Sequence, residues 1–108
     1  MKLYTWSRIA EEQVTPLATR QIVHTDTMTL VRRRLLKGST LQLHRHVEEQ
    51  VSMIDHGKVR FVVCGEEQIV TSGEALAIPS NAPHSVEALE DSVVLDVFPK
   101  PSTKELTE

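Results

Sequence analysis

Short apolar segments separated by turn residues dominate the sequence from Arg20 onward. Segments rich in Val, Ile, Leu and Thr recur about every 8 to 12 residues, with Gly, Pro, Asn or Asp between them. This spacing is typical of all-β chains. We expect strands at residues 21–24, 27–36, 42–46, 51–54, 58–64, 67–70, 75–78, 84–88 and 92–98. Strands joined by hairpin-length links suit a jelly roll or small barrel, which encloses a cavity.

The length of the chain bounds its organisation. Its 108 residues are close to the commonest size of one domain, and no shift in composition divides them. We therefore expect a single domain over residues 1–108, with the barrel at 20–98 and a mobile polar tail at 99–108. Residues 1–19 have weak periodicity and form an N-terminal edge segment, for which an edge strand and a short helix are both open.

Composition argues against several partners. Lys and Arg number 12 against 15 Asp and Glu, so the net charge is −3 and no basic surplus favours nucleic acid. The N-terminus lacks the apolar run of a signal peptide, and nowhere do about 18 apolar residues follow one another. We expect a cytoplasmic protein with no membrane partner.

Two further features are expected in strands. Cys64 is the only cysteine and is expected to pack in a strand as a small hydrophobe. The basic run 32–34 is also expected in a strand.

Two histidines stand at a spacing that can bind metal. Side chains alternate along a strand, so His44 and His46 project to the same face, while Leu41 and Leu43 pack on the other. Two imidazoles on one face can converge on a metal ion. The alternative for an isolated pair is two surface histidines on a half-exposed strand.

Two motifs surround these histidines: Gly38-x5-His44-x-His46-x3-Gln50-x6-Gly57 and Gly73-x5-Pro79-x-Asn81-x2-His84. They resemble the two sequence motifs of the cupins. The first has Gln50 where most cupins have a glutamate ligand, and the second has Asn81 where glycine is usual and Ala88 in place of the closing asparagine. The resemblance implies a cupin barrel, of the double-stranded β-helix type, that holds one divalent ion (Zn, Ni, Mn or Fe) through His44, His46 and His84.

The fourth ligand is left with two candidates. Parity favours Gln50, which shares the face of the histidines, whereas a bulge after His46 would turn Glu49 inward. A neutral amide leaves more positive charge on the ion than a carboxylate does, which favours use as a Lewis acid. A cupin that has lost its metal is the alternative. His24 and His56 lie outside both motifs and are expected to be surface or turn residues.

An aspartate interrupts the most apolar segment of the chain, residues 93–98. Burial of an unpaired carboxylate is costly, so Asp96 must find a partner, take up a proton or face a polar cavity. If Val94, Asp96 and Phe98 face inward, Asp96 lies in the metal cavity and can serve in acid–base catalysis. The alternative is the solvent face of an edge strand.

A second set of residues spans most of the chain: Arg20-Gln21-Ile22, Leu30-Val31, Lys37-Gly38, His44-x-His46, Gln50-Val51-Ser52, Gly57 and Leu95-Asp96-Val97-Phe98. This set resembles the small cupins of pectin breakdown, which convert 4,5-unsaturated uronates to their linear keto form. The resemblance implies three histidines and Gln50 as metal ligands, with Asp96 and Phe98 in catalysis. The family usually has an arginine after the final strand, whereas this chain has Lys100 and Lys104; these lysines, or an arginine of the run 32–34, are candidate contacts for a substrate carboxylate.

The residues and the two resemblances leave three candidate functions. The leading hypothesis is metal-dependent ketonisation or isomerisation of a small unsaturated sugar acid. An iron-type cupin dioxygenase is the second, because three-histidine sites also serve oxygen chemistry. A non-catalytic cupin that binds a small acidic ligand is the third. We also expect a homodimer, paired through strands near the N-terminus.

Overall fold

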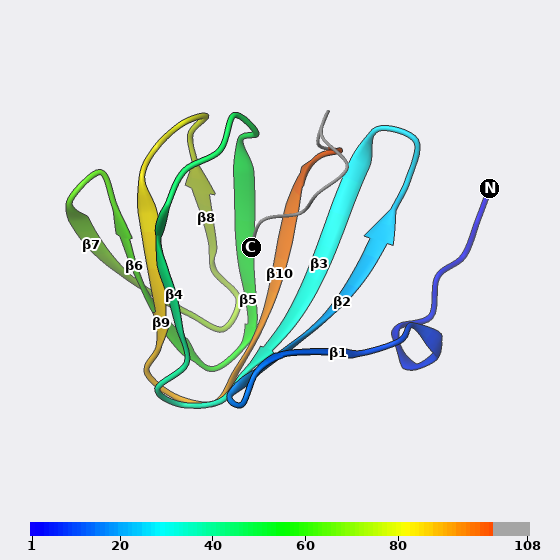
Figure 1. Cartoon of the computed structure of the whole chain (residues 1–108), viewed down its shortest axis with the longest axis horizontal. Helices are drawn as coiled ribbons and strands as arrows, with labels where there is room; N and C mark the ends of the chain where they lie inside the picture. The colour runs from blue at the N-terminus through cyan, green and yellow to red at the C-terminus, as the bar shows by residue number, and fades with distance from the viewer. Residues whose placement is uncertain (101–108) are drawn as a thin grey trace.

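The chain folds into two antiparallel sheets that face each other (Figure 1). The computed structural model describes residues 1–100, so the expected tail lies outside the description from residue 101 on. One sheet has the strand order β1-β2-β3-β10-β5-β8 and the other the order β4-β9-β6-β7. The elements are η1 (Trp6–Arg8), β1 (Glu12–Thr15), β2 (Ala18–His24), β3 (Met28–Leu35), β4 (Thr40–His44), β5 (Gln50–His56), β6 (Lys58–Val63), β7 (Glu66–Thr71), β8 (Ala75–Ile78), β9 (His84–Ala88) and β10 (Ser92–Pro99).

Side-chain alternation directs one face of each sheet into a shared core. On β10 every second residue is buried, from Ser92 to Phe98. Ile54 and Val94 of the six-stranded sheet, and Val59 and Phe61 of the four-stranded sheet, are each at most 2% exposed. The expected all-β architecture of two packed sheets is therefore confirmed.

The N-terminal segment contains both elements that the sequence left open. A single 3₁₀ turn, η1, precedes a short edge strand, β1, which pairs with β2 at the border of the six-stranded sheet. Strand β2 begins at Ala18, earlier than predicted. Across residues 1–100, no helix has the length and apolarity needed to cross a membrane.

The strand predicted at residues 42–46 is shifted toward the N-terminus. Strand β4 ends at His44, so His46 lies in the following loop, and the β4–β9 register shifts between Leu41 and His44. This irregularity breaks the alternation on which the packing of Leu43 was predicted, and Leu43 is 69% exposed. The prediction for Leu43 is therefore wrong.

Cys64 does not lie in a strand. Strand β6 ends at Val63, and the next strand begins at Glu66, so Cys64 and Gly65 form a two-residue hairpin loop. Both loop residues have positive φ, 50° for Cys64 and 80° for Gly65, as a hairpin turn of this length favours. The thiol is exposed at the tip of the hairpin rather than packed in the core.

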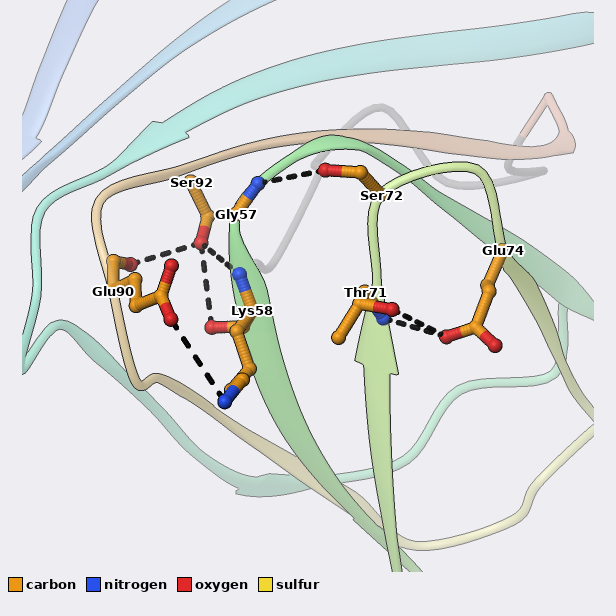
Figure 2. Close-up of polar contacts among 7 residues, drawn as sticks. All are labelled: Gly57, Lys58, Thr71, Ser72, Glu74, Glu90 and Ser92. Carbon is orange, nitrogen blue, oxygen red and sulfur yellow. Dashed lines mark hydrogen bonds and ion pairs between the residues drawn. The ribbon is translucent and has the colours of Figure 1, made fainter.

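The last glycine of the first motif, Gly57, separates β5 from β6 at a close contact with the start of β10. Its φ is +102°, and an added Cβ would lie 2.6 Å from the Asp91 carbonyl oxygen and 2.7 Å from Ser92 Cα. Ser92 is buried and its hydroxyl accepts a hydrogen bond from the backbone N–H of Lys58, which follows Gly57 (Figure 2). The Gly57 N–H donates to the Ser72 hydroxyl at 3.1 Å. Gly57 is thus required both by its φ and by the space available.

A neighbouring turn contains another glycine with positive φ but with open surroundings. Gly73 has a φ of +86°, and no heavy atom lies within 4 Å of the position that a Cβ would occupy. Next to it, the Glu74 carboxylate accepts hydrogen bonds from the backbone N–H and the hydroxyl of Thr71 (Figure 2). These bonds, the backbone one first, lower the pKa of Glu74. The two turns therefore offer a matched pair of glycines.

Replacement of Gly57 by Ala should destabilise the fold more than replacement of Gly73 by Ala. Both variants place a side chain at positive φ, which costs about 1–3 kcal/mol. Only Gly57→Ala adds the overlap with Asp91 and Ser92, and overpacking costs about 1–3 kcal/mol more. Urea denaturation measures the free energy of unfolding of each variant. Equal losses would contradict the steric role of Gly57.

Candidate metal centre

Three histidines from two distant parts of the sequence meet at one end of the two sheets. His44 ends β4 and is paired directly with His84, the first residue of β9, while His46 follows in the β4–β5 loop. One potential ligand atom from each histidine lies within 4.8 Å of the others. The ring centroids of His44 and His84 are 4.2 Å apart, and His46 lies 5.1 Å from His84. The histidines predicted as ligands are therefore brought together.

The other two histidines lie elsewhere. His24 and His56 are both exposed, at the ends of β2 and β5. The Nδ1 atom of His24 is 2.8 Å from the Thr29 hydroxyl. Their surface positions agree with expectation.

Backbone carbonyls orient all three clustered imidazoles. Nδ1 of His44 is 2.8 Å from the Gln42 carbonyl oxygen, Nδ1 of His46 is 2.9 Å from that of Glu48, and Nδ1 of His84 is 2.9 Å from that of Ala82. A carbonyl oxygen can only accept, so Nδ1 carries the proton in each neutral ring. The lone pair is then on Nε2, which is the arrangement that histidine metal ligands adopt.

Contacts between two loops hold His46, which is not on a strand. The backbone N–H of Asn81 donates to the His46 carbonyl oxygen at 2.8 Å, and the Ser80 hydroxyl donates to the Val47 carbonyl oxygen. The β4–β5 and β8–β9 loops thus lie side by side, at the upper end of the sheets in Figure 1. Asn81 has a φ of 60°, a conformation that asparagine tolerates better than most residues. Asparagine is therefore compatible with a motif position where glycine is usual.

Gln50 is the better placed of the two candidate fourth ligands. It begins β5 and is 2% exposed, whereas Glu49 is exposed. Its Nε2 donates to the Ser52 hydroxyl at 3.0 Å. Among the described residues, its buried Oε1 accepts no hydrogen bond. A buried acceptor without a partner is costly, and an amide oxygen is an acceptable ligand for a divalent ion.

Asp96 faces inward on a central strand, so the alternative of a solvent face on an edge strand is wrong. It is 4% exposed, and its Oδ2 accepts a hydrogen bond from Arg33 Nε at 2.8 Å. Its Oδ1 accepts one from the hydroxyl of Ser52, its partner in the β10–β5 register, at 2.7 Å. The carboxylate is thus in a buried ion pair, and it is linked to Gln50 through Ser52.

Sequence reasoning missed the specific roles of Arg33 and Ser52. The basic run lies in β3 as expected, with Arg32 half-buried, Arg33 buried and Arg34 exposed. Arg33 is the arginine of this run whose side chain is buried among the core residues, and there it pairs with Asp96. The available signal was alternation, because Val31, Arg33 and Leu35 share one face of β3.

Phe98, the other residue expected in catalysis, is close to the histidine cluster. It is 3% exposed, and its ring centroid is 6.2 Å from that of His46. Lys100 lies just after β10, where its backbone N–H donates to the Thr27 carbonyl oxygen at 2.8 Å. Lys104 lies outside the described residues.

The residues present fit a divalent metal ion. Three Nε2 lone pairs and one unpartnered amide oxygen make a neutral donor set that suits zinc, nickel, iron or manganese. The same set does not select among these ions. The three histidines could therefore hold a metal, and the fourth position is consistent with Gln50.

Two facing antiparallel sheets with three histidines at one end are the arrangement expected of a cupin. The family described as cupin domain, Cupin_2, matches residues 31–98, which include every candidate ligand. The chain belongs to this family. Its members often bind a metal ion.

Among individual proteins, the chain is similar to the pectin degradation protein KdgF of Dickeya dadantii (strain 3937). The two are 30% identical over 79 residues, which cover 71% of this chain and 72% of the relative. The structure of KdgF from a Halomonas species superposes with a TM-score of 0.89 at 25% identity, over 98% of this chain and 99% of that one. The chain is thus a small cupin similar to KdgF.

Other solved cupins share the fold. An RmlC-like cupin from Shewanella frigidimarina NCIMB 400 has a TM-score of 0.87 at 19% identity, over 94% of this chain and 93% of that chain. Bacillus subtilis oxalate decarboxylase, which has Mn(II) centres, has a TM-score of 0.80 at 25% identity, over 94% of this chain but 30% of that protein. Similarity of fold therefore extends to cupins of different chemistry.

Loss of Arg33 should be far more damaging than loss of its neighbour Arg34. Arg33→Met leaves the Asp96 carboxylate buried without its cation, which costs about 3–5 kcal/mol. Arg34→Met removes an exposed pair with Glu11, 3.5 Å apart, and such pairs contribute about 0–1 kcal/mol. Urea denaturation of the two variants compares the losses. Similar small losses would show that the Arg33–Asp96 pair is not required for stability.

A divalent ion should stabilise the protein, and this effect should depend on the histidine cluster. An ion that binds only the folded state at 100 times its Kd adds about 2.7 kcal/mol. We expect Ni²⁺, Zn²⁺ or Mn²⁺ to raise the Tm of the wild type and of His56→Ala, whose histidine is exposed outside the cluster. His84→Ala should lose the increase. A shift that persists in His84→Ala would place the bound ion elsewhere.

Proposed function

We propose that this chain is a metal-dependent cupin that ketonises a small unsaturated sugar acid, a 4,5-unsaturated uronate. The proposal is supported by the similarity to KdgF over most of both chains, together with one feature of the site: a neutral donor set connected to a buried carboxylate. His44, His46, His84 and Gln50 are the proposed metal ligands. When bound, the ion supplies a Lewis acid that polarises a substrate oxygen.

The donor set suits an acidic substrate. None of the four proposed ligands carries a negative charge, so the ligands do not offset the charge of a divalent ion. A uronate carboxylate is therefore attracted rather than repelled. Lys100 is a further candidate contact for that carboxylate, as a point charge in place of the arginine usual in the pectin-breakdown cupins.

Asp96 is the proposed proton carrier. Conversion of the cyclic uronate to its linear keto form removes a proton from the hemiacetal hydroxyl, breaks the bond between the ring oxygen and the hemiacetal carbon, and adds a proton to a carbon of the conjugated double bond, so it needs a group that accepts and returns a proton. Asp96 offers a carboxylate whose position is held by Arg33 and Ser52. Phe98, beside His46, is proposed to form an apolar wall of the substrate site. The reaction changes no oxidation state overall, so it requires no oxygen.

Turnover should be lost in Asp96→Asn while metal binding remains measurable. Removal of a general acid–base group typically lowers the rate about 10²- to 10⁴-fold. The metal-loaded protein is mixed anaerobically with unsaturated galacturonate, and the decay of the ultraviolet absorbance of the conjugated bond is followed. Asp55→Asn, at an exposed position on β5, is the matched control and should retain activity.

The same assay separates the competing functions. No decay with metal-loaded wild type would exclude this uronate as substrate. If a substrate is converted only in the presence of oxygen, and oxygen is consumed, a dioxygenase would be favoured. Ligand binding that raises the Tm without any turnover would favour a binding module.

We further propose a homodimer in the cytoplasm. Val51 and Met53 on the outer face of β5 are 36% and 37% exposed, and an apolar surface of this kind is compatible with pairing. Sedimentation equilibrium of the full chain measures the oligomeric state.

A further inference from the structure

Four buried side chains form a continuous chain of hydrogen bonds from β3 to the start of β5. Arg33 donates to Asp96 at 2.8 Å, Ser52 donates to Asp96 at 2.7 Å, and Gln50 donates to Ser52 at 3.0 Å. Their exposed fractions are 4% for Arg33 and Asp96, 2% for Gln50 and 0% for Ser52. Bulk water therefore contributes little to the balance of donors and acceptors along this chain.

The direction of each bond follows from counting protons. An ionised carboxylate only accepts, so the one hydroxyl proton of Ser52 is directed to Asp96 Oδ1. The Ser52 oxygen can then only accept from Gln50. Of the two ends of the Gln50 amide, the –NH₂ group alone can donate, so it must face Ser52. The amide oxygen is left as the end that is available to a ligand.

We propose that Arg33, Asp96 and Ser52 are positioning residues that set the amide orientation of Gln50, so that its oxygen rather than its nitrogen is presented to the metal. The inference rests on the proposed metal site with Gln50 as a ligand. The charge of Asp96 determines the direction of the Ser52 proton, and Ser52 transmits that direction to Gln50. Arg33 holds the Asp96 carboxylate, at which this series of hydrogen bonds begins.

This chain of hydrogen bonds also explains why position 50 carries glutamine where most cupins have glutamate. A glutamate there could not donate to Ser52, and it would compete with Asp96 for a single hydroxyl proton. Two carboxylates would then share one buried serine and one arginine. An aspartate at 96 and a serine at 52 therefore select an amide at 50.

Substitution of Ser52 by Ala tests the transmitting residue. Ser52→Ala removes the acceptor that holds the Gln50 amide, and loss of such an outer contact typically lowers metal affinity about 10- to 100-fold. Affinity is measured by competition with a chromogenic chelator, which needs no turnover. The control is Ser39→Ala, at another buried serine. Unchanged affinity in Ser52→Ala would overturn the proposal.

An exchange of the amide at position 50 with the carboxylate at position 96 tests the direction of the hydrogen bonds. In Gln50→Glu/Asp96→Asn the asparagine amide can donate to Ser52, and the Ser52 proton can turn to the glutamate, so both hydrogen bonds of Ser52 are satisfied in reverse while Arg33 loses its carboxylate partner. We expect each single variant to lower the Tm of the metal-free protein and the double variant to regain part of the loss. The regain should be smaller when Ser52→Ala is added, because restored charge balance does not need the hydroxyl whereas the reversed hydrogen bonds do.

The two failures are distinguishable. Tm losses that simply add in the double variant, or a regain of the same size with Ser52→Ala, would overturn the proposed chain of hydrogen bonds. These measurements use metal-free protein and do not depend on activity. Wild type that binds no divalent ion would instead defeat the proposed function, while the Tm comparison would still decide whether Asp96 sets the orientation of Gln50.

Discussion

The buried ion pair between Arg33 and Asp96 is the contact on which the arrangement of the site depends. A carboxylate in the middle of β10 is tolerated only because β3, the neighbouring strand, supplies a cation 2.8 Å away. The strand on the other side, β5, supplies the Ser52 hydroxyl to the second oxygen. The central strands β3, β10 and β5 are therefore held together by polar side chains at the level where the apolar core gives way to the site.

The same polar contacts connect the stability of the fold to the chemistry of the site. Burial of charges rarely adds net stability compared with apolar packing, so a pair of this kind has to be explained by specificity or function. Here the pair lies two hydrogen bonds from the proposed ligand Gln50. A change that relieves the cost of burial, such as an apolar pair at 33 and 96, would also remove the group that orients Ser52.

Local spacing made much of the site predictable, whereas tertiary packing decided the rest. The intervals within the two motifs identified the three histidines, and parity counted from His44 and His46 favoured Gln50, although β4 ends at His44 and Gln50 begins another strand. Parity could not say which face of β10 is inside, and the answer for Asp96 comes from Arg33, 63 positions away in the chain. In the fold, apolar character alone did not reveal where strand geometry is interrupted. A register shift exposes Leu43, and positive φ places Cys64 in a hairpin loop.

The three histidines are held by different kinds of contact. His44 and His84 are paired across two adjacent strands, whereas His46 lies in a loop whose position depends on the backbone contact with Asn81. Phe98 packs on the same side, beside His46, at the end of β10 that follows Asp96. Any adjustment at the site is therefore expected at His46, which lies in a loop, rather than at His44, His84 or Phe98, which lie in strands. The strand pair and the buried hydrogen bonds from Arg33 to Gln50 would keep the other groups in place.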